Sequence, residues 1–199
     1  VSHLGSEMTR SGHAEIKYND VRVSEENVLG EVGGGFRHVQ ERLGPARLTH
    51  CMRFSGMAER ALTIARTYLS EREAFGSPIA EKQNARFEIA RRETEIQAAR
   101  SLVRHTAEKI AEGEEARLGV SMSKVYTAQA AQDAIDTALQ SLGGNGISKD
   151  LPIADFYESV RPFRIIDGAD EVHLRTIART AFEEGVDPAE LDPVTRFGE

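Results

Sequence analysis

Hydrophobic and polar positions follow a helical period over most of this chain. From Phe36 onward, apolar residues recur three or four positions apart, which is the spacing of a helix with one buried face. The pattern predicts five helices, at residues 36–72, 79–111, 115–142, 152–160 and 170–184. The chain is therefore expected to be mainly α-helical.

Glycine and proline residues separate the predicted helices. Gly76 and Pro78 close the first helix, Gly113 the second, and the Gly143–Gly144 pair the third. Pro45 lies inside the first helix and predicts a kink or a break there, because proline has no backbone N–H to donate. Amphipathic helices with short connections favour an antiparallel four-helix bundle.

Residues 1–35 follow a different pattern. Apolar and polar residues alternate from Ala14 to Tyr18, as in a half-buried strand, and Val21–Val23 reads as a second short strand. Two or three strands do not form a stable sheet alone, so this segment is expected to be the end of a β-domain. The predicted organisation is thus a β-domain remnant and linker at 1–35, a helical bundle at 36–185 and a loosely ordered tail at 186–199.

Composition and charge narrow the function classes. The net charge of −7 and the lack of a basic stripe argue against nucleic acid as a partner. The single cysteine, Cys51, excludes an internal disulfide framework and C-x-x-C metal sites, and we expect it to be packed in the core. No apolar run is long enough for a bilayer, so we expect no membrane partner and a cytoplasmic or organelle-matrix enzyme.

The segment Arg72–Gly76 lies at the end of the first predicted helix. Arg72 could place its guanidinium on a phosphate, with Phe75 beside a ring system. The segment could equally be a helix C-cap whose cation faces the negative end of the helix dipole. Its residues alone do not decide between these interpretations.

A glycine-rich turn, Gln140–Gly146, ends the third helix with three glycines in four residues. One glycine is enough to stop a helix, so the others suggest close packing of a ligand or a subunit. The turn is not a dinucleotide-binding fingerprint, because it ends a helix and does not follow a strand.

Asp167 follows two isoleucines and precedes a glycine, and a carboxylate in such an apolar run is a candidate general base. The simpler interpretation makes Asp167 the N-cap of the last helix, with Asp170 and Glu171 as first-turn acids that the helix dipole favours. His173 is expected to be a surface or supporting histidine rather than a catalytic one.

Together and in this order, the motifs resemble the C-terminal part of the acyl-CoA dehydrogenase family. The resemblance rests on five blocks: Asp20–Phe36, Arg72–Ile79, Gln83, Gln140–Gly146 and I-I-D-G-A-D-E-V-H, which ends at His173. The segment Arg42–Arg53 looks most like the subfamily that in animals includes kinase-fused members. The resemblance covers the chain to about Arg179.

The resemblance implies that a carboxylate removes the α-proton of an acyl-CoA while the β-hydrogen leaves as hydride to FAD, giving a trans-2-enoyl-CoA. Asp167 takes the position of the base, where most members have glutamate. Some members place the base on the first long helix, but the matching residue is Ala46, which cannot serve. Arg47 matches an arginine that orients the base loop and the substrate, and Gly168 belongs to the same substrate-binding loop.

The resemblance also implies residues that bind FAD. Some contact the flavin or the pyrophosphate, and others hold the ADP end of an FAD bound in a neighbouring subunit. The first set is Arg72, Phe75, Ala169 and Glu171, and the second is Gln83, Gln140, Gly143 and Gly144. Ala169 stands where the family usually has threonine, so a hydroxyl contact to the cofactor is missing there.

The implied partners are an acyl-CoA substrate, an electron-transfer flavoprotein and further copies of the chain in a homodimer or homotetramer. The family carries a helical domain and a β-domain ahead of this region, so we expect the isolated chain to be a fragment that does not turn over and binds FAD weakly or not at all. Alternatives are an acyl-CoA oxidase, a nitroalkane-oxidase-like enzyme of the same fold, or a non-catalytic helical scaffold.

Overall fold

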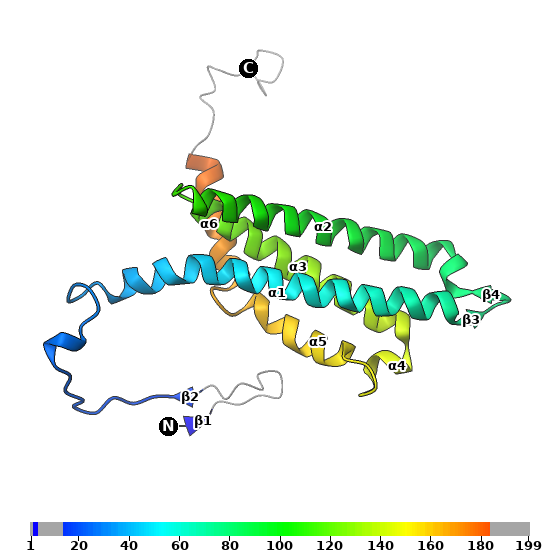
Figure 1. Cartoon of the computed structure of the whole chain (residues 1–199), viewed down its shortest axis with the longest axis horizontal. Helices are drawn as coiled ribbons and strands as arrows, with labels where there is room; N and C mark the ends of the chain where they lie inside the picture. The colour runs from blue at the N-terminus through cyan, green and yellow to red at the C-terminus, as the bar shows by residue number, and fades with distance from the viewer. Residues whose placement is uncertain (1, 4–13, 184–199) are drawn as a thin grey trace, which may run out of the picture.

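The computed structural model describes residues 2–3 and 14–183, which are predominantly helical (Figure 1). The α-helices are α1 (Gly35–Glu71), α2 (Gln83–Ala111), α3 (Arg117–Leu142), α4 (Gly144–Ile147), α5 (Ile153–Val160) and α6 (Asp170–Glu183). Three 3₁₀ turns are η1 (Glu25–Asn27), η2 (Ile79–Glu81) and η3 (Arg161–Arg164). The predicted mainly α fold is confirmed.

Along the chain, each long helix runs antiparallel to the one before it, so α1 and α3 are parallel and α2 is opposite, with α3 packed against both of the others (Figure 1). The buried face of α3 is rich in alanine, which lets the neighbouring helices approach closely. Its fully buried apolar positions are Ala128, Ala131, Ala134, Ile135 and Ala138. The core lies between these helices and continues into α5 and η3 through Ile153, Val160 and Phe163.

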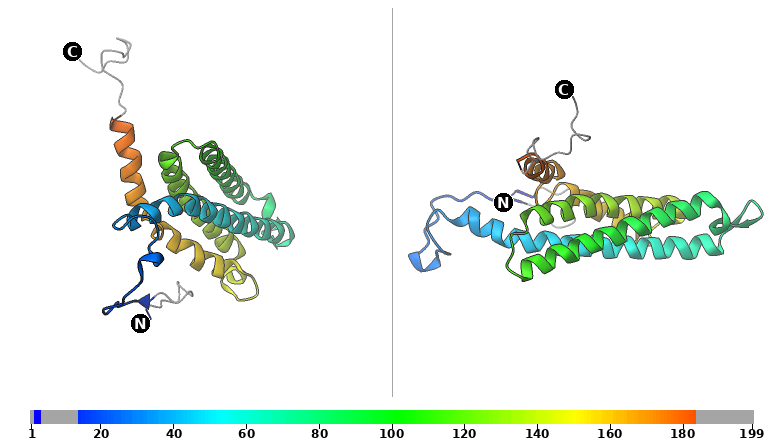
Figure 2. Two further views of the ribbon diagram at one scale, coloured as in Figure 1. Left: turned by 60° about the vertical axis from the view of Figure 1, so that its left-hand side comes forward. Right: turned by 90° about the horizontal axis from the view of Figure 1, so that it is seen from above.

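The last helix is oriented differently from the long ones. Seen from above, α6 is viewed nearly end-on while the three long helices lie in the plane of the picture (Figure 2). It packs on α3, and η3 and the loop before α6 connect it to α5. The bundle is therefore three long helices in up-down-up order, with α6 crossing one end.

A small hairpin closes the other end of the bundle. Its strands β3 (Glu73–Ala74) and β4 (Ser77–Pro78) pair antiparallel, with Glu73 opposite Pro78. The two turn residues between them, Phe75 and Gly76, have φ angles of 54° and 84°. Two positive φ angles at the centre of a two-residue turn match the twist of the flanking strands.

The helix boundaries agree with the sequence pattern to within a few residues, with two differences. The second helix begins at Gln83 instead of Ile79, because Ile79–Glu81 form the separate turn η2. The helix does not break at Pro45, which lies inside α1. Pro45 and the preceding turn at Glu41 are exposed, so water can solvate the carbonyl that loses its partner.

The strand predictions were mostly wrong. Of Ala14–Tyr18, only β2 (Ala14–Glu15) is a strand, paired with β1 (Ser2–His3), and Val21–Val23 forms none. The described residues of this segment offer no further strand to accept its hydrogen bonds, so the alternating pattern stays unpaired and exposed (Figure 1). The tail predicted at 186–199 lies outside the described residues.

Candidate functional site

Asp167 lies in the loop between η3 and α6 with a left-handed backbone conformation, φ 57°. Arg47 of α1 donates from its Nε to the Asp167 carbonyl oxygen at 2.7 Å. The next residue, Gly168, has φ 97°, and a Cβ there would lie 2.9 Å from Nε2 of His173. Arg47 therefore contacts the loop that carries Asp167, and Gly168 is needed for the shape of that loop.

His173 of α6 holds the same carbonyl from the other side. Its Nε2 lies 3.2 Å from the Asp167 carbonyl oxygen, and its Nδ1 lies 3.2 Å from Oγ of Ser121 on α3. A carbonyl only accepts, so Nε2 carries the proton and Nδ1 accepts from the serine. Burial, with Arg47 and Lys124 nearby, lowers the pKa of His173 despite its bond to the Asp167 carbonyl. His173 is thus a buried supporting residue, as expected, and not a surface one.

His50, on the same face of α1 as Arg47, approaches the Asp167 side chain itself. Its Nε2 lies 3.2 Å from Oδ2 of Asp167. Its ring stacks near Phe54 and Phe163, at centroid distances of 6.5 and 6.1 Å. His50 is not among the site residues that the sequence predicted. The available signal was its spacing of three residues from Arg47, which places both on one helix face.

Beneath the loop lies a buried ion-pair network. Lys124 of α3 has no exposed surface, and its Nζ lies 2.7 Å from Oδ1 of Asp170. Arg164 of η3 reaches the other oxygen of Asp170 at 2.8 Å, and the Lys124 ammonium lies 5.3 Å from the ring centre of Phe163. The network joins α3, η3 and α6, and so fixes both ends of the loop that carries Asp167.

The structure corrects one interpretation of this loop. The Ala169 carbonyl accepts from the backbone N–H of Val172 and His173, so Ala169 and not Asp167 precedes the first turn of α6. Asp170 and Glu171 are first-turn acids as predicted, and Glu171 is exposed. Asp167 is therefore free of the capping role, and its carboxylate is available for other chemistry.

Cys51 is fully buried in the core, as predicted. Burial raises the pKa of its thiol to about 12, which keeps it protonated and unreactive.

The second group of predicted site residues meets at the hairpin end of the bundle. Arg72 is the C-cap of α1, and its guanidinium makes no hydrogen bond or ion pair with any described residue. Phe75 at the tip of the hairpin is 97% exposed. Lys82 holds the turn by donating to the Phe75 carbonyl at 3.2 Å and to Oγ of Ser77 at 2.7 Å. An exposed aromatic ring at the tip of the braced turn and a free cation at its base thus lie three residues apart in the sequence.

Gln83 begins α2 and Gln140 lies in the last turn of α3, both exposed and at this same end. Gly143 ends α3 with φ 56° and ψ −132°, a conformation that requires glycine. Gly146 is needed for packing, since a Cβ there would lie 2.4 Å from the Leu139 carbonyl oxygen. Gly144 has no such internal reason and open space around it. Only part of the glycine cluster is thus explained by the fold.

The two groups are far apart. We call Arg47, His50, Asp167 and His173 the loop end, and Arg72, Phe75, Gln83, Gln140, Gly143 and Gly144 the hairpin end. From Arg47 to Glu71 the axis of α1 rises about 36 Å. Each group is brought together by the fold, but the two are separated by more than an extended dinucleotide spans.

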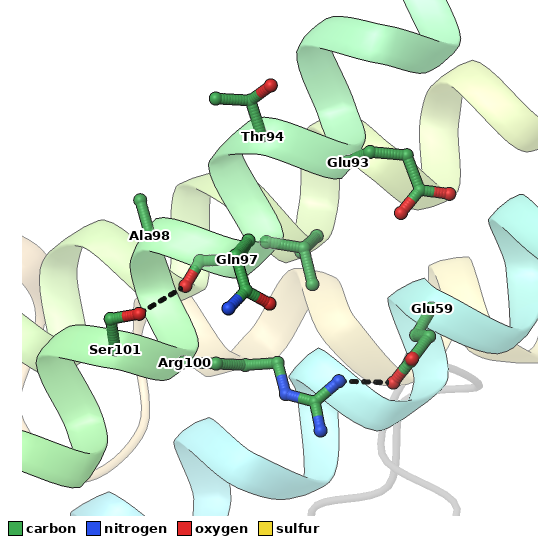
Figure 3. Close-up of a pocket in the computed structure, with 8 residues that line it drawn as sticks. Glu59, Glu93, Thr94, Gln97, Ala98, Arg100 and Ser101 are labelled. Atoms are coloured by element: carbon green, nitrogen blue, oxygen red, sulfur yellow. Dashed lines mark hydrogen bonds and ion pairs between the residues drawn. The ribbon is translucent and has the colours of Figure 1, made fainter.

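A groove of about 660 Å³ lies elsewhere, between α1 and α2 (Figure 3). Arg100 points across it to Glu59 at 2.6 Å, and Glu93 on its rim pairs with Arg66 at 3.1 Å. The charged side chains that line the groove therefore form ion pairs between α1 and α2, and the groove contains none of the predicted site residues. Among the described residues there is no cluster of histidine, cysteine or acidic side chains that could hold a metal ion. No helix in the described ranges has the length and hydrophobicity of a membrane span.

Residues 33–182 match the family model described as acyl-CoA dehydrogenase, C-terminal domain. The chain belongs to the acyl-CoA dehydrogenase family. Among curated proteins, it is 47% identical over 172 residues to the probable acyl-CoA dehydrogenase FadE2 of Mycobacterium tuberculosis, covering 85% of this chain and 42% of that protein. It is 41% identical over 181 residues to mouse acyl-CoA dehydrogenase family member 10, covering 90% of this chain and 17% of that protein.

Solved structures of acyl-CoA dehydrogenases share the fold. Butyryl-CoA dehydrogenase from Megasphaera elsdenii is 32% identical with a TM-score of 0.79, covering 83% of this chain and 43% of that one. A putative acyl-CoA dehydrogenase from Mycobacterium abscessus is 39% identical with a TM-score of 0.74, covering 76% and 38%. This acyl-CoA dehydrogenase chain therefore spans less than half the length of these relatives, and the predicted family and helical domain are confirmed.

Proposed function

We propose that this chain supplies the base and part of the cofactor surface of an FAD-dependent acyl-CoA dehydrogenase. In this enzyme Asp167 removes the α-proton of an acyl-CoA thioester, and the β-hydrogen leaves as hydride, so that a trans-2-enoyl-CoA is formed. The other domains that the longer relatives carry would complete the acyl-CoA cleft. The electrons then pass to an electron-transfer flavoprotein.

The observation that carries the proposal is the way in which Asp167 is held. Arg47 and His173 both donate to its main-chain carbonyl, so the loop is fixed without using the carboxylate. The carboxylate side chain is 21% exposed. A rigid backbone with a partly accessible carboxylate is what proton transfer from a bound substrate requires.

The hairpin end fits one portion of FAD. Arg72 has no partner among the described residues and offers a planar cation suited to a pyrophosphate. Gln83 and Gln140 offer exposed amides, and the open backbone at Gly144 allows close approach. Phe75 offers an exposed ring face. FAD, when bound, supplies the hydride acceptor.

The separation of the two ends supports an assembly of at least two copies. One FAD cannot reach from the loop end to the hairpin end of the same chain, since α1 alone rises about 36 Å between them. In the proposed homodimer or homotetramer, the hairpin end of one copy binds the ADP portion of the cofactor that serves the loop end of its neighbour. The isolated chain is accordingly expected to show no turnover.

The test is an Asp167→Asn substitution in the enzyme that contains this chain together with the domains of its relatives. Asparagine tolerates the left-handed conformation at residue 167, so the loop keeps its shape. Reduction of bound FAD by acyl-CoA should slow by about 10³-fold, the usual scale for loss of a general base. Asp150→Asn, at an exposed turn position, is the matched control and should leave the rate unchanged. Unchanged reduction in the Asp167→Asn enzyme would refute the assignment.

A further inference from the structure

The two oxygens of the Asp167 carboxylate have different surroundings. Oδ2 is buried, forms no well-aligned hydrogen bond, and has His50 Nε2 as its neighbour at 3.2 Å. No described residue donates a hydrogen bond to Oδ1, and this oxygen is not buried without a partner as Oδ2 is. The imidazole therefore lies against the inner oxygen and leaves the outer one open.

The position of His50 is set by packing. It comes from α1, one turn beyond Arg47, and its ring lies against Phe54 of the same helix and Phe163 of η3. Phe54 and Phe163 are fully buried and contact one another with centroids 4.6 Å apart. The imidazole thus lies against two buried phenylalanine rings, with its Nε2 3.2 Å from the carboxylate oxygen Oδ2.

The charges around His50 keep it neutral near pH 7. Partial burial lowers its pKa, and the cations Arg53 and Arg42 on α1 lower it further, while Asp167 raises it. Arg47 lies on the same face with its guanidinium on the Asp167 carbonyl. From η3, the Phe163 ring lies against His50, and the Lys124 ammonium from α3 lies 5.3 Å from the centre of that ring.

We propose that His50 is a positioning residue for the base, holding the inner oxygen of Asp167 so that the outer oxygen, Oδ1, receives the substrate proton. This inference rests on the proposed function and names a residue that the function itself does not require. In the substrate-bound enzyme, a neutral imidazole with its proton on Nε2 would donate to Oδ2 without neutralising the carboxylate; in this structure the two atoms lie 3.2 Å apart without hydrogen-bond alignment. A protonated imidazole pairs with the carboxylate more strongly and makes it a weaker base.

The kinetic test compares His50→Leu with His50→Gln in the complete enzyme. Leucine removes the donor, so we expect FAD reduction to slow by about 10- to 100-fold, the scale of a misplaced reacting group. Glutamine keeps an N–H donor of similar reach and should restore most of the rate at high pH. His105→Leu, at an exposed site on α2, is the matched control and should have no effect.

The pH dependence separates positioning from a merely structural role. As the pH falls through the His50 titration, the wild-type enzyme forms the imidazolium–carboxylate pair and slows, whereas His50→Gln has no such step. The ratio of the wild-type rate to the His50→Gln rate should therefore decrease between about pH 8 and 5. A His50→Leu enzyme with the wild-type rate and pH profile would overturn the proposal.

A second measurement serves if His50→Leu fails to fold. The His50 ring proton of the 199-residue chain is titrated by NMR, with its resonance identified by its loss in His50→Gln. Asp167→Asn should lower the His50 pKa, because it removes the negative charge that raises it. An unchanged pKa overturns the proposal. If Asp167→Asn abolishes FAD reduction but the His50 variants keep the wild-type rate, pH profile and pKa, only the positioning role of His50 fails. If Asp167→Asn has no effect on FAD reduction, the proposed function fails as well.

Discussion

The two ends of the bundle present the same backbone feature in opposite settings. At the loop end, Asp167 and Gly168 have φ angles of 57° and 97°, and at the hairpin end Phe75 and Gly76 have 54° and 84°. In each case a cation holds the carbonyl of the non-glycine residue, Arg47 on Asp167 at 2.7 Å and Lys82 on Phe75 at 3.2 Å. A left-handed residue is costly unless its surroundings fix it, and both ends provide that support.

What differs is where the side chain goes. The Asp167 side chain is 21% exposed and faces His50, whereas the Phe75 side chain is 97% exposed and packs on no described residue. The Asp167 loop is thus held by contacts within one chain, as suits a group that must be positioned before substrate binds. At the hairpin end, the Arg72 guanidinium and the Phe75 ring have no partner among the described residues, which fits the proposal that a cofactor and a second copy complete this surface.

The largest expected effect is a loss of stability when the buried ion pair under the Asp167 loop is removed. In Lys124→Met, the buried Asp170 loses its ammonium partner at 2.7 Å and keeps only Arg164. We expect the free energy of unfolding of the chain to fall by about 3–5 kcal/mol, because a buried charge is left partly uncompensated. Urea denaturation measures it.

The matched control removes a more exposed pair. Arg100→Gln breaks the ion pair with Glu59, which lies at 2.6 Å with the Glu59 side chain 53% exposed, and should cost no more than about 1 kcal/mol. Equal losses in Lys124→Met and Arg100→Gln would show that the loop does not depend on the buried network.

The comparison also explains what could be predicted from sequence. Helices and their ends were found because apolar periodicity and the Gly and Pro stops act locally. The resemblance placed Asp167 and Arg47 in one site, and the structure joins them by a bond across 120 residues. No local pattern marks such a contact. Lys124 is the clearest case, since a lysine on a helix is usually solvated and only tertiary packing shows that this one is buried.

The strands were mispredicted because a strand depends on a partner elsewhere in the chain, which local alternation does not show. Alternation at Ala14–Tyr18 states which residues could share a face, but a strand also needs a neighbour to accept its hydrogen bonds. Among the described residues, Ser2–His3 pairs with only two positions of that run. His50 could not be predicted because its contact with Asp167 spans the fold, and its spacing from Arg47 is a weak signal on its own.

An effect of intermediate size is expected at the hairpin end, where removal of the Phe75 ring should weaken cofactor binding with little change in stability. Phe75→Gly relieves a left-handed phenylalanine but adds freedom to the unfolded chain, so its stability should change by no more than about 1 kcal/mol. FAD retention in the complete enzyme should nevertheless weaken by roughly 10-fold, the scale of one lost aromatic stacking contact. Retention is measured by the flavin released on dilution and filtration.

Phe182→Ala is the matched control for that experiment. Phe182 is 88% exposed, but it lies on α6 and outside the hairpin end. Its removal should leave FAD retention unchanged. Full retention in Phe75→Gly would argue that the exposed ring has no part in holding the cofactor.

The smallest effect concerns acid sensitivity of the loop end. His173 is 6% exposed and its pKa is lowered, mainly by burial. In the unfolded chain the His173 pKa is about 6.5, so below that pH the unfolded chain binds a proton that the folded chain does not. The contribution of His173 to the free energy of unfolding is therefore fully present above pH 6.5. It is lost as the pH falls toward the lower pKa of the folded chain. His173→Gln can still donate to the Asp167 carbonyl but does not titrate. As the pH is lowered from about 7.5 to 5.5, the wild-type chain should therefore lose stability relative to His173→Gln, as measured by urea titrations at each pH. A difference that stays constant over that range would mean that the imidazole bridging Ser121 and Asp167 accepts a proton as readily in the fold as out of it.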